Sequence, residues 1–524
     1  MTIRSRIVVL VAVLAVALGV VLLGAVRTPD DGGKAARPTA SDPTTPPAQP
    51  LARVCGNRDA LDGPRRPPAG AVTVGTDEPL DDVAGAHPPG TTFWLETGVH
   101  KLGTGKFDQI EPEDGDTYIG APGAVLDGQR RNSYAFTGSA SAVTVAHLTV
   151  QNFGASASNN DEGVVNHDAA PGWTIRDNTV RRNAGAGVML GSRNVLRGNC
   201  LSDNGQYGFS AYHPDGVRQL TLAGNEVVGN NTDDWERRRP GCGCSGGGKF
   251  WEVTGADVRA NWVHDNRGAG LWADTNNAGF TIERNYIAHN DAEGVFYEAS
   301  YNAAIRYNTF ARNGRVKGKE SASFPTGAIY LSEAGSDSRV KTRHSAAFEI
   351  TGNLFLDNWS GVILWENADR FVGSPANTST GSSTLVNPDT VTAETCNRKN
   401  IRKKPYYDDC RWKTQNVRVH DNDFRLTRRA VGNTCTADTG CGYNGVFANW
   451  GTYPAWSPYR NDVIQERIVF EQDNRFFANR YRGPWQFAVG DQGTRVPWSS
   501  WRAAPYRQDE GSVHTPKSGS STGD

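Results

Sequence analysis

The sequence predicts an all-β fold, a single-stranded right-handed parallel β-helix with a cap at each end. Pairs of asparagines recur five residues apart, and short runs of alternating apolar and polar residues separate them without any helical period. Where the units are uninterrupted, the first asparagine returns every 21 to 24 residues. The pairs are Asn178/Asn183, Asn199/Asn204, Asn225/Asn230, Asn261/Asn266, Asn285/Asn290, Asn308/Asn313, Asn353/Asn358 and Asn474/Asn479.

Each repeated unit is too short to bury its own apolar face. The unit at residues 173–183, for example, reads WTIRDNTVRRN and holds only two short strands. Units of this kind become stable when they stack in register, because neighbouring coils then bury a continuous core. An asparagine at a fixed turn position can donate to the next coil, so we expect the paired asparagines to form structural ladders.

On these units, over about residues 143–479, the chain resembles the right-handed parallel β-helix proteins of the pectate-lyase-like superfamily, most of all its secreted bacterial members. That superfamily includes polysaccharide lyases, glycoside hydrolases, uronan epimerases, phage tailspikes and binding proteins. Residues 231–234 (NTDD) match part of a polygalacturonase motif, whose Gly-His-Gly and Arg-Ile-Lys parts are missing from this sequence. The Asp/Arg pattern of classical pectate lyases is not recognisable either. The resemblance therefore implies the fold and leaves the activity open.

The repeat also defines the other parts of the chain. Two arginines followed by an apolar run from Ile7 to Val26 predict an export signal or a membrane anchor. The predicted parts are the signal peptide or anchor at 1–27, a disordered Pro/Thr-rich linker at 28–50, the β-helix at 51–507 with insertions at 231–247, 314–326 and 373–411, and a disordered tail at 508–524.

Cysteine content and charge indicate where the protein works. Eight cysteines fit an oxidising compartment, so we expect an extracellular protein, secreted or anchored to the cell surface. The expected disulfides are Cys396/Cys410 and Cys435/Cys441, and Cys242 and Cys244 are expected in a disulfide rather than a metal site. A net charge of −1 gives no reason to expect nucleic acid as a partner. We expect a monomer that meets a membrane only through its N-terminus.

Candidate site residues come from the strand that follows the second asparagine of each unit. We align these strands on a glycine: Gly187, Gly208, Gly248, Gly270, Gly294, Gly327 and Gly361. Side chains alternate along a strand, so the second and fourth residues after this glycine should face outward. The fourth position then holds Glu252, Asp274 and Glu298 on three successive rungs. Like charges stacked in this way destabilise a sheet, which suggests a function.

Other side chains are expected beside these acids. The second position holds the aromatic residues Phe250, Trp272 and Phe296, which suit stacking against sugars. The remaining candidates for substrate binding are Lys249, Tyr212, His213 and Arg238. Two insertions flank the acids and carry Arg237, Arg238, Arg239, Arg315, Lys317 and Lys319. These cations either form a solvated surface or hold an anionic glycan.

The pattern favours an enzyme that cleaves a polysaccharide, which could contain uronates, by carboxylate-based glycoside hydrolysis. Asp274 would be the nucleophile and Glu298 the proton donor, with Glu252 tuning the pair and no cofactor needed. One alternative is a lyase or epimerase in which the three acids hold Ca²⁺ and Lys249 or His213 is the base. Another alternative is a non-catalytic β-helix protein that binds glycans at the cell surface.

Overall fold

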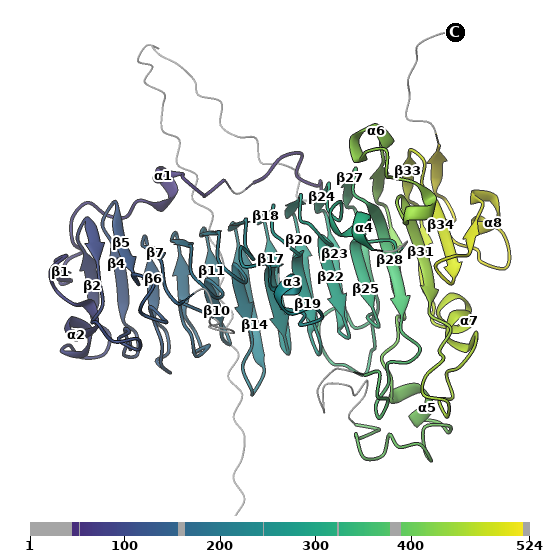
Figure 1. Ribbon diagram of the computed structural model, residues 1–524, viewed down its shortest axis with the longest axis horizontal. Coiled ribbons are helices and arrows are strands. Elements are labelled where there is room, and N and C mark those ends of the chain that lie inside the picture. The colour runs from purple at the N-terminus through teal and green to yellow at the C-terminus, as the bar shows by residue number, and fades with distance from the viewer. Residues whose placement is uncertain are drawn as a thin grey trace, which may run out of the picture. The chain divides into compact units, whose positions relative to one another are not determined.

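The computed structural model describes residues 44–51, 53–155, 163–244, 246–321, 324–377 and 389–516. Residues 44–516 of this set form a parallel β-helix with three sheets, as predicted (Figure 1). A typical coil runs from sheet 1 to sheet 3 and then to sheet 2. Neighbouring strands are parallel, except for the antiparallel pair at the end of sheet 2.

Within each sheet, each strand forms hydrogen bonds with the strand of the next coil, so the order of strands in the sheet is their order along the solenoid. Sheet 1 contains β1 (Val72–Val74), β2 (Thr92–Leu95), β4 (Thr117–Gly120), β6 (Thr144–Ala146), β8 (Thr174–Arg176), β11 (Val195–Arg197), β14 (Val217–Ala223), β17 (Val253–Arg259), β20 (Ala278–Glu283), β23 (Tyr301–Arg306), β26 (Phe348–Thr351), β29 (Val417–His420) and β32 (Arg475–Phe477). Sheet 2 contains β10 (Val188–Leu190), β13 (Phe209–Ala211), β16 (Gly246–Trp251), β19 (Ala269–Asp274), β22 (Val295–Glu298), β25 (Gly327–Ser332), β28 (Ser360–Glu366), β31 (Tyr443–Ala448), β34 (Gln486–Gly490) and β35 (Arg495–Val496). Sheet 3 contains β3 (Gly98–His100), β5 (Ala124–Asp127), β7 (Thr149–Gln151), β9 (Thr179–Arg181), β12 (Cys200–Ser202), β15 (Glu226–Val228), β18 (Trp262–His264), β21 (Tyr286–Ala288), β24 (Thr309–Ala311), β27 (Leu354–Leu356), β30 (Asp423–Arg425), β33 (Arg480–Arg482) and β36 (Val513–Thr515).

The helices are short and lie at the ends or in insertions. They are α1 (Arg58–Leu61), α2 (Leu80–Gly85), α3 (Trp235–Arg238), α4 (Lys317–Glu320), α5 (Tyr406–Asp409), α6 (Arg428–Val431), α7 (Val463–Phe470), α8 (Trp498–Arg502) and the 3₁₀ turn η2 (Ala437–Thr439). Within the described residues, α7 is the longest at eight residues. The expectation of a β-helix without a helical domain is therefore confirmed.

The asparagines form two hydrogen-bonded ladders. The ladder between sheets 1 and 3 contains Asn178, Asn199, Asn225, Asn261, Asn285, Asn308, Asn353, Asn422 and Asn479. The ladder between sheets 3 and 2 contains Asn183, Asn204, Asn230, Asn266, Asn290, Asn313 and Asn358. In each ladder, the backbone N–H of one asparagine donates to Oδ1 of the asparagine on the next coil.

The expected pair Asn474/Asn479 is wrong. Asn479 continues the first ladder, where its Oδ1 accepts the N–H of Asn422 at 3.1 Å. Asn474 lies on a different turn, where its Oδ1 accepts the N–H of Val417 at 3.3 Å. Asn474 lies directly before β32 of sheet 1, whereas the asparagines of the first ladder follow the strands of sheet 1, so the five-residue spacing of Asn474 and Asn479 does not make them a pair of the repeat.

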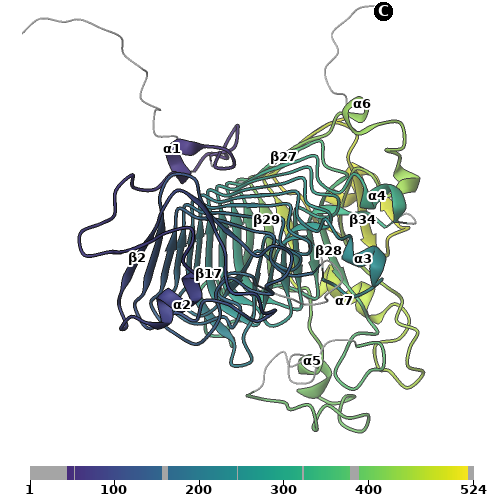
Figure 2. The same cartoon turned by 60° about the vertical axis from the view of Figure 1, so that its left-hand side comes forward.

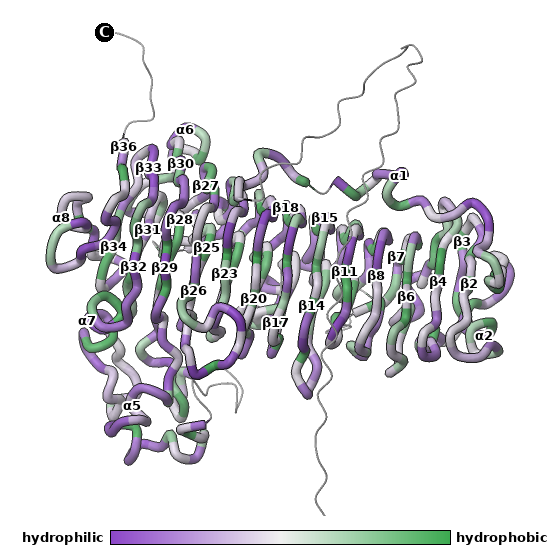
Figure 3. The backbone as a smooth tube through the Cα atoms, turned by 180° about the vertical axis from the view of Figure 1, so that it is seen from behind, coloured by the Kyte–Doolittle hydropathy of each residue, from purple (hydrophilic) through white to green (hydrophobic). Residues whose placement is uncertain are grey.

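The inside of the solenoid is filled by the inward-facing side chains of all three sheets. Hydrophilic and hydrophobic residues alternate along many of the strands (Figure 3), as expected of strands with one face turned to the core. Phe280 of sheet 1 packs edge-on against Phe250 and Tyr297 of sheet 2, with ring centroids 5.1 and 5.8 Å apart. Tightly packed contacts of this kind fix the distance between the sheets and make sheet 2 a rigid platform.

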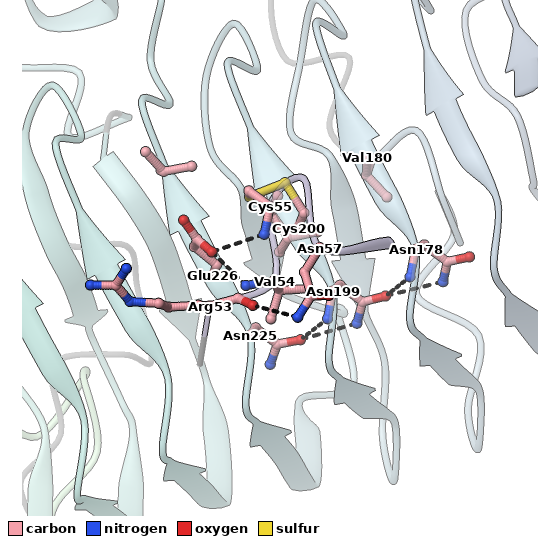
Figure 4. Close-up of a disulfide and its surroundings, with 12 residues drawn as sticks. Arg53, Val54, Cys55, Asn57, Asn178, Val180, Asn199, Cys200, Asn225 and Glu226 are labelled. Atoms are coloured by element: carbon pink, nitrogen blue, oxygen red, sulfur yellow. Dashed lines mark hydrogen bonds between the residues drawn. A yellow bond between two sulfur atoms is a disulfide. The ribbon is translucent and has the colours of Figure 1, made fainter. Parts of the chain in front are cut away.

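The N-terminal arm is fastened along sheet 3 (Figure 4). Cys55 forms a disulfide with Cys200 of β12, and Oε2 of Glu226 accepts the N–H groups of Val54 and Cys55 at 2.7 and 2.9 Å. Further toward the N-terminus, Thr309 donates to the carbonyl of Pro47 at 2.6 Å. The described part of the expected linker, residues 44–50, therefore contacts the solenoid.

The described part of the expected C-terminal tail also belongs to the fold. Strand β36 pairs with β33. Before it, the carboxylate of Asp509 is fully buried and accepts hydrogen bonds from Trp501 Nε1 at 2.7 Å and from the Tyr481 hydroxyl at 3.0 Å. These bonds satisfy a buried carboxylate and fix the last turn. The prediction of a disordered tail is therefore wrong for residues 508–516.

All eight cysteines are paired. The disulfides Cys396–Cys410 and Cys435–Cys441 are as expected. Cys242 and Cys244 are in a disulfide, as expected, and the structure shows that they pair with each other, while Cys55 pairs with Cys200. In the described part of the chain, no helix has the length and apolar character of a membrane span. The apolar run from Ile7 to Val26 lies outside the described residues.

Candidate active site

The outward face of sheet 2 differs from the predicted register at two strands. In β16, Lys249 pairs with Trp272, and Trp251 pairs with Asp274. Gly247 thus takes the place expected for Gly248. Gly246, Gly247 and Gly248 are consecutive, so no side chain marks which of them aligns with the other rungs. In β25 a shift of one residue in the opposite direction places Ala328 where Gly327 was expected, because Tyr330 pairs with Phe296.

This shift corrects two predicted site residues. Phe250 points into the core and is only 1% exposed, so it cannot stack against a ligand. Glu252 lies on the turn after β16, where its φ of 55° takes it out of the extended strand. The predicted column of three acids therefore contains two, Asp274 and Glu298, which pair directly across β19 and β22.

The corrected register gives two outward columns of side chains on sheet 2. The first column is Ser210, Lys249, Trp272, Phe296, Tyr330 and Ile363. The second column is Trp251, Asp274, Glu298, Ser332, Trp365 and Phe447. Tyr212 extends the second column, with its ring 5.9 Å from that of Trp251. Two adjacent carboxylates thus lie between aromatic residues on both sides along the solenoid.

The two carboxylates have different partners. Asp274 forms an ion pair with Lys249 at 2.8 Å and accepts a hydrogen bond from the Thr275 hydroxyl at 2.8 Å. Glu298 forms an ion pair with Arg370 at 2.5 Å and accepts a hydrogen bond from Trp272 Nε1 at 3.2 Å. Their side chains are 14% and 16% exposed, so both are largely shielded but remain accessible from outside.

The proton affinity of Glu298 is unusually high. Burial is the main cause that raises its pKa to about 7, and the negative charges of Asp274 and Glu333 act in the same direction. Arg370 opposes the shift, but this guanidinium also binds Glu333 at 3.0 Å, so its charge is shared by two carboxylates. A carboxyl group with a pKa near 7 can hold a proton at neutral pH and release it during a reaction.

A stack of aromatic rings lies next to the carboxylates. Trp272 and Phe296 are stacked with centroids 4.9 Å apart, and Phe296 and Tyr330 are stacked at 4.8 Å. The ammonium group of Lys249 lies 4.5 Å from the ring of Trp272 and 5.2 Å from that of Trp251. The rings therefore fix the position of the cation that faces Asp274.

The two insertions form walls beside this face. Helices α3 and α4 lie on the side of the solenoid that carries β28 and β34 (Figure 2). Between them is a cavity of about 860 Å³ with Trp272 and Phe296 among its lining residues. Its charged lining residues are Asp234, Glu236, Asp291, Glu293, Glu320, Arg237, Arg267 and Lys317. Carboxylates thus outnumber cations, which does not favour an anionic ligand there.

Two of the arginines expected in the walls are engaged elsewhere. The guanidinium of Arg238 lies 3.5 Å from Asp233. Arg315 donates two hydrogen bonds to the carbonyl of Asp357, at 3.0 and 2.7 Å. Neither partner is one of the acids of sheet 2. The expectation that the insertions gather positive charge around the carboxylates is therefore not supported by their geometry.

The remaining candidates lie on the rung before β16. Tyr212 is 39% exposed and is placed to stack against a ligand beside Trp251. His213 lies on the turn that follows, where its Nδ1 accepts the N–H of Asp215 at 3.2 Å. Sequence reasoning missed Arg370, Glu333 and Trp251. Trp251 could have been found with the correct register, but Arg370 lies in an insertion that belongs to no repeat.

The three expected Ca²⁺ ligands do not form one set, although Asp274 and Glu298 are adjacent. Glu252 is on the turn, and Asp274 and Glu298 already face Lys249 and Arg370. Among the residues that the structure describes, no three Asp, Glu, His or Cys side chains are grouped as a metal-binding set. The residues of this face therefore do not fit the Ca²⁺ site that a lyase of the expected kind would require.

Comparison with known proteins supports the architecture. A family model described as "Right handed beta helix region" matches residues 130–249, 165–343 and 255–382 in overlapping segments. A comparison with curated proteins found no match.

Among solved structures, the chain is similar to the catalytic unit of a thermostable GH87 α-1,3-glucanase from Streptomyces thermodiastaticus, at 15% identity over 76% of this chain and 68% of that chain, with a TM-score of 0.45. It is also similar to the A-module of a mannuronan C-5 epimerase from Azotobacter vinelandii, at 14% identity over 71% of this chain and 95% of that chain, with a TM-score of 0.41. A pectate lyase is similar at 14% identity over 54% of this chain and 70% of that chain, with a TM-score of 0.32. These likenesses concern the fold alone. With its three parallel sheets and its matching family model, the chain is a right-handed parallel β-helix protein.

Proposed function

We propose that this protein hydrolyses glycosidic bonds of a polysaccharide, with Asp274 and Glu298 as the reacting carboxylates. The observation that carries the proposal is the pairing of these two acids on adjacent rungs of an outward face, in different surroundings. Glu298 has a pKa raised to about 7, whereas Asp274 is paired with a lysine. Pairs of carboxyl groups in unlike environments are typical of acid/base catalysis.

The surroundings assign a role to each acid. Glu298 would give its proton to the glycosidic oxygen as the bond to the leaving sugar breaks. Asp274, which is ion-paired with Lys249, would attack the anomeric carbon and form an ester. Water would then cleave that ester while Glu298 takes up the proton of the water. Adjacent parallel strands lie about 4.8 Å apart, which is close to the carboxyl separation of retaining glycosidases.

Neighbouring side chains would orient the pair. The indole N–H of Trp272 donates to Oε2 of Glu298, and Arg370 binds its Oε1, so both oxygens of this carboxyl group have a fixed partner. Groups held in this way lose little freedom when the substrate reacts. When Glu298 has given up its proton, the guanidinium group of Arg370 stabilises the carboxylate that remains.

The aromatic residues on both sides of the acids suggest how the substrate lies. Trp251 is one rung before Asp274, and Trp365 is two rungs after Glu298 in the same column. A glycan that runs along the solenoid can stack sugar rings on both while its middle bond lies over the carboxylates. We therefore infer that the bond cleaved lies within the polysaccharide chain rather than only at its end. The four disulfides favour an extracellular place for this reaction.

A panel of neutral, acidic and amino polysaccharides tests the proposal. The purified protein is expected to release new reducing ends from at least one of them, and to do so with a chelator present. Binding without any product would instead indicate a glycan-binding protein. An unsaturated, ultraviolet-absorbing product would indicate β-elimination, with Lys249 as the nearest candidate base.

The pH profile should report the proton of Glu298. Because its pKa is raised to about 7, Glu298 is protonated and able to act below that pH and loses the proton above it. We expect kcat to fall as the pH rises through about 7. Changing Glu333 to glutamine removes a neighbouring negative charge and frees Arg370 for Glu298, so the alkaline limb should move to lower pH. A limb that does not move in Glu333→Gln would contradict the assigned environment.

A further inference from the structure

The disulfide Cys242–Cys244 closes a very small loop at the edge of the site. Only Gly243 lies between the two cysteines, and their Cα atoms are 5.2 Å apart. We propose that this Cys-Gly-Cys loop, which we call the clip, is a positioning element that holds Lys249 against Asp274. The inference rests on the proposed function, because it explains how the nucleophile keeps its counter-ion.

The clip binds Lys249 through a backbone carbonyl. The Gly243 carbonyl accepts the ammonium group of Lys249 at 2.5 Å and the hydroxyl of Tyr207 at 3.3 Å. The same ammonium group donates to Asp274 at 2.8 Å. Lys249 therefore bridges the clip and the carboxylate, and its side chain is only 8% exposed.

The clip also packs against the ring that lies beside Lys249. Gly243 has a φ of +58°, and a Cβ atom built on it would lie 3.0 Å from Cη2 of Trp272. A larger residue would have to push this indole, which is the ring closest to the ammonium group. Both the positive φ and the close approach of the indole therefore favour glycine at this position.

Lysine needs such a support because its side chain is a flexible four-carbon stem that ends in a strongly hydrated charge. With the clip open, the Gly243 carbonyl is no longer fixed, and the ammonium group can turn toward water. Asp274 then loses the cation that faces it at 2.8 Å. The rings of Trp251 and Trp365 stay on their strands when the clip opens, so the loss should appear in kcat more than in KM.

The double variant Cys242→Ser/Cys244→Ser of the full chain tests the inference. A hydrogen bond to a charged group contributes a free energy equal to roughly a 10- to 100-fold change in rate. We expect kcat on the polysaccharide identified above to fall by about that factor, with KM changed less than about twofold. Cys435→Ser/Cys441→Ser, which removes another short-range disulfide, is the matched control and should keep kcat.

A second readout does not require activity. An amine-reactive reagent should modify Lys249 slowly in the wild type and roughly tenfold faster in Cys242→Ser/Cys244→Ser, as measured by mass spectrometry of digested protein. A wild type that cleaves no glycan overturns the proposed function, and the labelling rates then test the clip alone. Unchanged labelling of Lys249, or an unchanged kcat in an active protein, overturns the clip.

Discussion

Replacing Glu298 with glutamine is expected to lower kcat by about two to four orders of magnitude, the range by which a general acid accelerates such reactions. Glutamine keeps the shape and can still accept the hydrogen bond from Trp272, but it has no proton to give to the leaving oxygen. Release of reducing ends at about pH 6, where the wild-type carboxyl group is protonated, measures the loss. A substrate with a good leaving group needs no protonation in the first step, so it should be affected less.

Glu252→Gln is the matched control for this variant. Glu252 has the same side chain and lies on the turn directly after β16, but it is outside the column of Asp274 and Glu298. Its replacement should change kcat by less than about twofold, as expected of substitutions away from the reacting groups. Equal losses in Glu252→Gln and Glu298→Gln would show that the register places the wrong acids in the site.

Replacing Asn285 with alanine is expected to lower the free energy of unfolding by about 3 to 5 kcal/mol, since each buried group left without a partner costs about 1 to 3 kcal/mol. Asn285 accepts the N–H of Asn261 at 2.9 Å and donates to the carbonyl of Val258 at 2.9 Å and to Oδ1 of Asn308 at 3.0 Å. All these groups are buried in the middle of the first ladder. Urea denaturation followed by circular dichroism measures the change.

The exposed Asn57 offers a comparison for the ladder. Its side chain makes one exposed hydrogen bond, to the carbonyl of Arg53 at 3.2 Å. Asn57→Ala should therefore change the unfolding free energy by less than about 0.5 kcal/mol. If Asn285→Ala is no more destabilising than Asn57→Ala, the ladders do not hold the coils together.

The fold could be predicted from sequence because the same physical requirement is repeated in every coil. Each turn needs a side chain that both accepts and donates, and asparagine supplies both groups. The spacing of Asn261 and Asn285 then gives the length of one coil. Asn474 shows the limit of this reasoning. Two asparagines with the right spacing indicate a ladder position only if the coils before and after them carry asparagines at the same position.

The site was only partly predictable. Asp274 and Glu298 lie on strands whose register is marked by a single glycine each, and the alternation of side chains predicts that the two acids are adjacent. Glu252 was misplaced because a run of glycines carries no alternation, so the register of β16 had no sequence signal. Arg370 was not found because it comes from a segment 72 residues away from Glu298, whose path over the sheet is set by tertiary contacts.

The most direct test of the central claim is to trap the ester on Asp274. The Glu298→Gln variant is incubated with an aryl glycoside of the cleaved sugar, whose leaving group departs without protonation, and is then digested with trypsin. Because the second step also needs Glu298, the glycosyl-enzyme should accumulate. The peptide of residues 268–284 should then carry one added sugar, on Asp274. Hydrolysis without any labelled peptide, or a label on Glu283 of the same peptide, would contradict the account.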